Sequence, residues 1–155
     1  MNRSRRHALK AGGSAGVLAL LVAAGVVRPG GALAQASPSA FDVKTLSEAL
    51  KALGAQSPAV SDAIQIKAPE IAENGAVVPI GVESRLPGTQ SITLLVEKNP
   101  QPLTASFDIP AGTEPSISTR VKMGESSDVY ALVKADGKFY VAKKEIKITL
   151  GGCGG

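Results

Sequence analysis

Few of the residue types that carry chemistry in proteins occur in this chain of 155 residues. It has no tryptophan, two tyrosines, three phenylalanines, one histidine and one cysteine. A core with so few aromatic side chains has to be built from aliphatic ones. The single histidine, His7, lies close to the first residue, and the single cysteine, Cys153, lies close to the last. Any function that needs several histidine or cysteine side chains is therefore excluded.

The first 34 residues have the composition of a secretory signal. A basic stretch from Arg3 to Lys10 contains a twin arginine, and an uncharged apolar run of 13 residues, Ala15 to Val27, follows it. Ala32 to Ala34 forms a small-residue cleavage site, and a second site allows cleavage after residue 36. A transmembrane anchor, the alternative, would need about 20 apolar residues. We expect a Tat signal peptide, export to the periplasm and no membrane attachment after cleavage.

Removal of this signal changes what the charges imply. Five of the 17 basic residues and none of the 13 acidic ones lie in it, so 12 basic and 13 acidic residues remain, a net charge of −1. Without an excess of basic residues, the exported part lacks the basic surface that nucleic-acid binding needs. Because His7 leaves as well, no Ser–His or Cys–His nucleophile pair and no usual zinc or haem ligand set can form. We expect no cofactor, no metal and no nucleic acid.

One helix is predicted near the start of the exported part, after an Ala/Ser/Pro linker at residues 35–40. The helix runs from Asp42 to Gly54, with Ser39 or Asp42 as its N-cap and Gly54 with Pro58 at its end. Four apolar residues fall on one face: Val43, Leu46, Leu50 and Leu53. We expect this face to cover one end or edge of the domain. Binding of a partner protein is the alternative.

The rest of the chain alternates as strands do, with turn residues between the segments. We expect strands at 63–68, 76–83, 91–97, 103–109, 117–123, 128–135 and 138–150. Asp136-Gly137 predicts a tight hairpin between the last two, and Asn74-Gly75 predicts a turn before the second. The pattern is typical of an all-β fold, an immunoglobulin-like antiparallel β-sandwich of about seven strands with one short N-terminal helix, over residues 41–150.

For three of these strands the sequence also predicts which residues face inward, an edge position or a bulge. In the fourth, Leu103, Ala105, Phe107 and Ile109 are expected to share the inward face. Pro79 inside the second predicts an edge position, because proline donates no ladder hydrogen bond. In the last strand the apolar positions change from odd (Phe139, Val141) to even (Ile146, Ile148, Leu150). A strand cannot change parity without an extra residue, so we expect a β-bulge near Lys143-Lys144-Glu145.

The chain ends in Gly151-Gly152-Cys153-Gly154-Gly155. Glycines on both sides predict a flexible arm over 151–155 that carries a thiol clear of the core. From Leu150, the last expected core residue, Cys153 can reach about 10 Å. No helix N-terminus, metal or adjacent cation is there to activate the thiol, which favours a residue that other proteins act upon. A plain disulfide dimer through Cys153 is the alternative.

The terminal pentapeptide after a lysine-rich strand resembles the SoxY family, the sulfur-carrier subunits of the thiosulfate-oxidising Sox system. The resemblance runs from about Phe41 to the end, and four interior segments share it: Glu73–Pro79, Asn99–Leu103, Thr119–Met123 and Lys134–Lys138. It implies a carrier that is not itself an enzyme, with Cys153 as the covalent attachment point. Gly151, Gly152, Gly154 and Gly155 would provide hinge and clearance around it.

The resemblance also implies partners. SoxY proteins pair with SoxZ, a second immunoglobulin-like sandwich, as the SoxYZ heterodimer. The haem enzyme SoxAX joins thiosulfate to the cysteine as an S-thiosulfonate, and SoxB removes sulfate to leave a persulfide. SoxCD oxidises the outer sulfur in some systems. The hypothesis from another class is a non-catalytic periplasmic immunoglobulin-like interaction module that dimerises through its lone cysteine.

Overall fold

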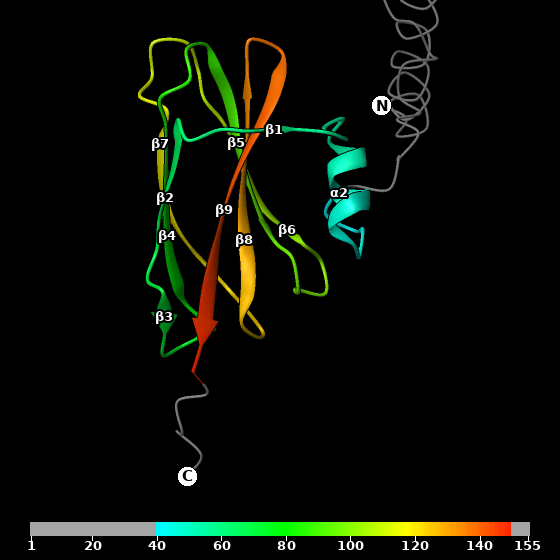
Figure 1. Cartoon of the computed structure of the whole chain (residues 1–155), viewed down its shortest axis with the longest axis vertical. Helices are drawn as coiled ribbons and strands as arrows, with labels where there is room; N and C mark the ends of the chain where they lie inside the picture. Colours follow the sequence, from blue (N-terminus) through cyan, green and yellow to red (C-terminus); the bar gives the residue numbers. More distant parts are fainter. Residues whose placement is uncertain (1–39, 150–155) are drawn as a thin grey trace, which may run out of the picture. The chain divides into compact units, whose positions relative to one another are not determined.

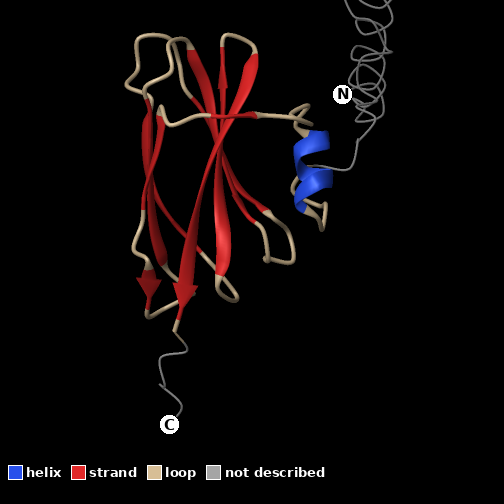
Figure 2. Ribbon diagram, in the orientation of Figure 1, coloured by secondary structure: helices blue, strands red, loops and turns tan. Residues whose placement is uncertain are grey.

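The computed structural model describes residues 40–149, which contain one helix and nine strands (Figures 1 and 2). The helix is α2 (Leu46–Ala52). The strands are β1 (Ala59–Val60), β2 (Ile64–Lys67), β3 (Ile71–Ala72), β4 (Val78–Ser84), β5 (Thr89–Val96), β6 (Leu103–Asp108), β7 (Ser116–Val121), β8 (Ser127–Ala135) and β9 (Lys138–Ile148).

The strands form two sheets, and the predicted β-sandwich is confirmed. The larger sheet has the order β1-β9-β8-β5-β6, with β3 also paired to β9, and the smaller has the order β2-β4-β7. The two-residue strands β1 and β3 were not expected, because alternation cannot be recognised over two residues. Both run parallel to β9. All other pairings are antiparallel.

An aliphatic core lies between the two sheets. It contains the inward sets that alternation predicts for β4 and β5, together with every second residue of β8. Its most deeply buried members are Val78, Ile80, Val82, Ile92, Leu94, Val96, Val129, Ala131, Val133 and Ile146. Burial of each such side chain contributes about 1.5–3 kcal/mol, so this layer supplies most of the driving force for the fold.

Helix α2 covers the outer face of the larger sheet. Its apolar residues pack on a second buried cluster that contains Leu95, Leu103 and Leu132. The expectation that the helix covers an end or an edge is therefore wrong, since it lies on a sheet face. The helix begins at Leu46 rather than at Asp42.

The residue that caps α2 is Thr45, not Ser39 or Asp42. The Thr45 side chain accepts a hydrogen bond from the Glu48 backbone N–H at 3.3 Å. Thr45 and Glu48 have the spacing of a capping box, Ser/Thr-x-x-Glu, in which a glutamate follows the cap by three residues. This signal was present in the sequence, and it marks the observed start.

No bulge interrupts β9, so that prediction is wrong. Pairing with β8 is continuous from Ser127↔Ile146 to Ala135↔Lys138. The even residues of β9, such as Ile146, face the core between the sheets, and the odd residues Phe139 and Val141 pack on the cluster under α2. Even-numbered residues of β9 face the smaller sheet, and odd-numbered residues face the cluster under α2. Apolar residues at both kinds of position are therefore buried without any change of register.

A bulge does occur in β6, where none was expected. Leu94 pairs with Ala105 but Leu95 pairs with Leu103, which leaves Thr104 as an extra residue. Leu103 therefore packs in the cluster under α2, whereas Phe107 packs against the core between the sheets. The predicted common face of Leu103 and Phe107 is wrong for this reason.

Pro79 lies in β4, the central strand of the smaller sheet, but its own position is a local edge, as predicted. It pairs with Arg120 of β7. On its other side β2 reaches only as far as Gly81, opposite Lys67. At Pro79 itself β4 thus has a neighbour on one side only, so the missing N–H costs no ladder hydrogen bond.

An ion pair links β2 and β4 on the outer face of the smaller sheet. Lys67 Nζ lies 2.6 Å from Glu83 Oε2, and the hydrogen bond from Lys67 lowers the pKa of the Glu83 carboxyl. A lowered carboxyl pKa adds stability above the pKa of the unfolded chain, and this stability is lost as pH falls through the folded pKa. We expect Lys67→Met to raise the Glu83 pKa toward its ordinary value, measured by NMR titration, while Arg85, 3.9 Å from Glu83, still lowers it slightly.

Lys122→Met is the matched control, because no ion pair of Lys122 occurs within residues 40–149. It should leave the Glu83 titration unchanged. The difference in unfolding free energy between Lys67→Met and the unaltered protein should shrink as the pH falls below the Glu83 pKa. A Glu83 titration unmoved by Lys67→Met would show that the ion pair does not set it.

Candidate functional site at the end of β9

The segment that carries the predicted site begins where β9 ends. Cys153, the four glycines of the arm and Leu150 lie outside the described residues, as do the signal peptide and most of the linker. The last described residue is Thr149, directly after β9. The structure therefore describes the base from which the predicted arm leaves the domain, and we call this base the exit.

Hydrogen bonds hold the chain on both sides up to the exit. On one side β3 pairs with β9, Ala72 opposite Ile148. The Lys147 and Thr149 N–H groups donate to carbonyls of Glu70 and Ala72 at 2.9 and 3.1 Å. On the other side the Ile148 N–H donates to Ser126 Oγ at 2.9 Å. In Figure 1, β3 lies beside the lower end of β9.

A tight turn at Asn74-Gly75, as predicted, packs against the exit. Asn74 Oδ1 accepts from the Ala76 N–H at 2.9 Å, and the Gly75 carbonyl accepts from the Met123 N–H at 2.7 Å. A Cβ atom on Gly75 would lie 2.5 Å from the Met123 carbonyl oxygen and 3.2 Å from Ile148 Cγ2. Only glycine allows these three segments to approach so closely.

Asn99 connects the two sheets at the same end. Its Nδ2 donates to the Lys122 carbonyl at 2.7 Å, and its Oδ1 accepts from the Gly124 N–H at 3.3 Å. Three of the four segments that suggested the family, those containing Gly75, Asn99 and Met123, thus converge near Ile148. The fourth contains the Asp136-Gly137 hairpin, which closes the opposite end of β9.

A polar network covers the outer face of the larger sheet between α2 and the exit. Lys143 Nζ lies 2.8 Å from Asp128 Oδ2, a hydrogen bond that raises the pKa of Lys143. Tyr130 donates to Glu97 at 3.1 Å, and burial, followed by this bond to Glu97, raises the Tyr130 pKa. These groups bond to each other and so link neighbouring strands on this face.

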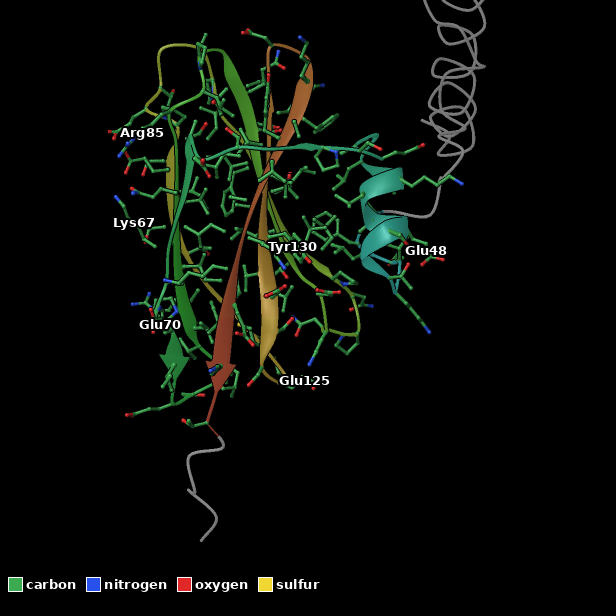
Figure 3. The ribbon with its side chains drawn as sticks, viewed as in Figure 1. Glu48, Lys67, Glu70, Arg85, Glu125 and Tyr130 are labelled. Carbon is green, nitrogen blue, oxygen red and sulfur yellow. The ribbon has the colours of Figure 1, made fainter. Side chains whose placement is uncertain are left out.

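Charged residues of both signs lie near the exit, among them Glu70, Lys144 and Lys147, and Figure 3 labels two of the acidic ones. In that view Glu70 and Glu125 lie on either side of β9. Lys144 is half-buried, and its ammonium donates to the Ala68 carbonyl at 2.6 Å. Lys147 is exposed. The pairing of Glu125 with Lys98 at 3.8 Å is loose and open to water, and such pairs contribute little to stability.

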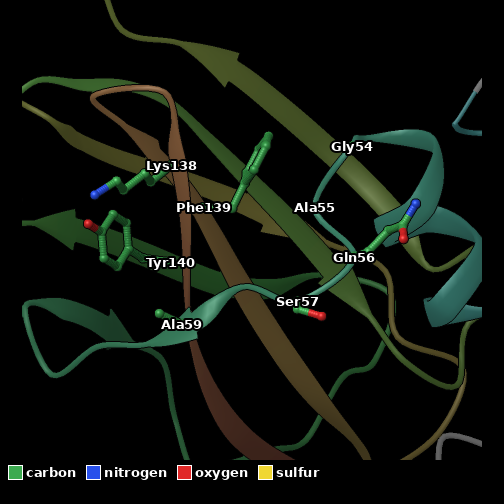
Figure 4. Close-up of a pocket in the computed structure, with 8 residues that line it drawn as sticks. All are labelled: Gly54, Ala55, Gln56, Ser57, Ala59, Lys138, Phe139 and Tyr140. Carbon is green, nitrogen blue, oxygen red and sulfur yellow. The ribbon is translucent and has the colours of Figure 1, made fainter.

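The pocket in Figure 4 lies away from the exit. Residues Gly54 to Ser57 and Ala59 line one side of it, and Lys138, Phe139 and Tyr140, at the start of β9, line the other. Its volume is about 350 Å³. Within residues 40–149, no three histidine, cysteine, aspartate or glutamate side chains are grouped so as to hold a metal ion. No helix in that range has the length and apolar character to cross a membrane.

Comparison with known proteins finds a matching family and matching solved structures. The family described as sulfur oxidation protein SoxY matches residues 49–153. The structure of the sulfur carrier protein SoxY from Chlorobium limicola f thiosulfatophilum is 41% identical, with a TM-score of 0.62 over 70% of this chain and 95% of that one. No match was found among curated proteins.

A second solved structure resembles the fold alone. It is the superoxide reductase (neelaredoxin) from Ignicoccus hospitalis, 21% identical, with a TM-score of 0.50 over 56% of this chain and 80% of that one. The family match, by contrast, covers most of the described residues and continues to Cys153. This chain belongs to the SoxY family of sulfur oxidation proteins.

Proposed function

We propose that this protein is a covalent carrier of sulfur intermediates in periplasmic thiosulfate oxidation, with Cys153 as the attachment point. The observation that carries the proposal is the family match, which includes Cys153, the only cysteine of the chain, as its last residue. A protein with a single thiol has a single place for a cysteine-bound intermediate. Membership in the SoxY family supports a role as a sulfur carrier.

The geometry of the exit supports the same role. The fold holds the chain as far as Thr149, and Cys153 follows four residues later. Four residues span at most about 14 Å. A thiol at that distance from the sandwich can enter a narrow pocket of a second protein while the sandwich stays outside. The flanking glycines have no side chains that would obstruct entry.

The proposed sulfur chemistry has two steps. The Cys153 thiolate joins the outer sulfur of thiosulfate, and two electrons pass to the haem of SoxAX, which leaves a cysteine S-thiosulfonate. SoxB then adds water, so that sulfate and two protons leave and a persulfide remains. The carrier supplies the sulfur atom and the tether, and the partner enzymes supply catalysis. SoxCD, where present, would oxidise the outer sulfur, and SoxZ would form the stable heterodimer.

Intact-mass spectrometry of the protein from thiosulfate-grown cells tests this proposal. We expect thiosulfonate and persulfide adducts that localise to Cys153 after digestion and disappear on reduction. Protein from cells grown without thiosulfate is the control and should carry fewer adducts. Only free thiol or a plain disulfide dimer under both conditions would contradict the carrier role and favour the interaction module.

A further inference from the structure

We propose that Ile71 and Val77 form an apolar docking surface, here called the exit collar, for the rim of the enzyme pocket that receives Cys153. This inference rests on the carrier role proposed above. It adds a contact surface on the folded domain to a function otherwise assigned to the arm alone. The occupant is the surface of a catalytic protein that surrounds a cleft.

Exposed large apolar side chains are few in residues 40–149, and two of them flank the exit. Ile71 is 57% exposed and Val77 is 48% exposed. Ile71 pairs with Lys147 in the short β3–β9 ladder, directly before the exit. Val77 follows the turn whose Gly75 packs on Ile148, and its N–H donates to the Asn74 carbonyl. Ile71 is thus held directly against β9 by strand pairing, and Val77 belongs to the turn that packs on Ile148 through Gly75.

The length of chain beyond the exit determines what must touch this surface. Cys153 is four residues beyond Thr149, a reach of at most about 14 Å. A pocket that takes the thiol to a depth close to this reach brings its own rim to the end of the sandwich. Water-exposed apolar side chains there lose contact with water in the complex, which favours association.

A hollow beside Ile71 gives the rim a place to interlock. It has a volume of about 290 Å³ and is lined by Glu70, Ile71, Lys144, Glu145 and Lys147. It opens where the edge of β9 has no paired strand, because β1 ends opposite Val141 and β3 begins opposite Lys147. A side chain from the rim could enter this hollow and contact both charged side chains and main-chain groups.

Val60 provides a matched control on the same edge of the sheet. It is 83% exposed and belongs to β1, a two-residue strand parallel to β9 like β3. It pairs with Val141, however, seven residues before Ile148, a distance of roughly 23 Å along a strand. Val60→Glu therefore introduces the same charge into the same type of strand, far from the exit.

The experiment measures sulfate release by the hydrolytic enzyme from carrier loaded with thiosulfate, over a range of carrier concentrations. We expect Ile71→Glu and Val77→Glu to raise KM by about tenfold or more, the loss expected when burial of one apolar side chain is prevented. The kcat should stay within about twofold, because the arm and Cys153 are unchanged. Val60→Glu should leave both constants unchanged. Ile71→Ser, which adds no charge, should give a smaller rise in KM.

Two further measurements separate the possible failures. Alkylation of Cys153 by iodoacetamide should proceed at the same rate in every variant, and each should co-purify with the partner subunit. If Ile71→Glu and Val77→Glu match Val60→Glu in KM, the exit collar is wrong. If they instead lose the partner subunit, the surface binds that subunit and the proposal is also wrong. Failure of the carrier role would appear differently, as absence of adducts on the unaltered protein.

Discussion

Replacement of Cys153 by serine should abolish thiosulfate-dependent sulfate formation and leave thermal unfolding unchanged. A serine hydroxyl cannot form a sulfur–sulfur bond, so neither the thiosulfonate nor the persulfide can be held. The residue lies four positions beyond Thr149, where the hydrogen bonds of the exit end, so the exchange removes no described contact from the core. Sulfate release in a reconstituted system and the Tm of each variant are the measurements.

Lys122→Met is the control for this prediction, because it exchanges one side chain of the folded domain and leaves Cys153 and the glycines of the arm unaltered. It should still accept thiosulfate and carry adducts. If Cys153→Ser kept its activity, or carried a sulfur adduct, the attachment point would lie elsewhere and the carrier role of this residue would be wrong. A fall in Tm would show instead that the arm packs on the domain.

Gly75→Ala should greatly lower the stability of the fold, although it removes no favourable contact. The added methyl group would lie 2.5 Å from the Met123 carbonyl oxygen, a main-chain atom that cannot rotate away. Overpacking of this kind typically costs about 1–3 kcal/mol. The free energy of unfolding in urea should fall by that amount, and Tm should fall by about 4 °C or more per kcal/mol.

Gly124→Ala is the control at the same end of the sandwich. A Cβ atom on Gly124 meets no heavy atom within 4 Å, and alanine keeps the N–H that donates to Asn99. Its stability should change little. If Gly75→Ala were as stable as Gly124→Ala, the turn would not be packed against the exit as described.

Local sequence patterns were sufficient for much of the sandwich. Alternation in β4 and β5 identified the side chains that fill the core between the sheets, because a strand half-covered by another sheet has one apolar face. Asp136 and Gly137 have φ values of 48° and 74°, the left-handed pair that a two-residue hairpin of this sequence requires. The capping-box spacing of Thr45 and Glu48 is also present in the sequence, but the prediction started the helix at Asp42 and so did not include Thr45 as a cap.

The errors in β6 and β9 share one physical cause. A period-two pattern shows that a face is apolar, but it does not show which element covers that face. Phe139 and Val141 of β9 are apolar because α2 covers them, whereas Ile146 faces the second sheet. The pattern predicts a bulge in β9, whereas the register shifts at Thr104 in β6 and between Thr89 and Ser91 in β5 leave no mark in the alternation.

The sequence by itself determined which thiol the proposed carrier chemistry can use. A chain with one cysteine, next to glycines that offer no core contacts, has only one candidate thiol. Tertiary structure alone decided what surrounds the base of that segment, because Ala72, Gly75, Asn99 and Met123 are far from Ile148 in sequence. Side-chain patterns report on local neighbours, whereas the packing of these residues around the exit depends on loops that approach one another only when both sheets close over a common core.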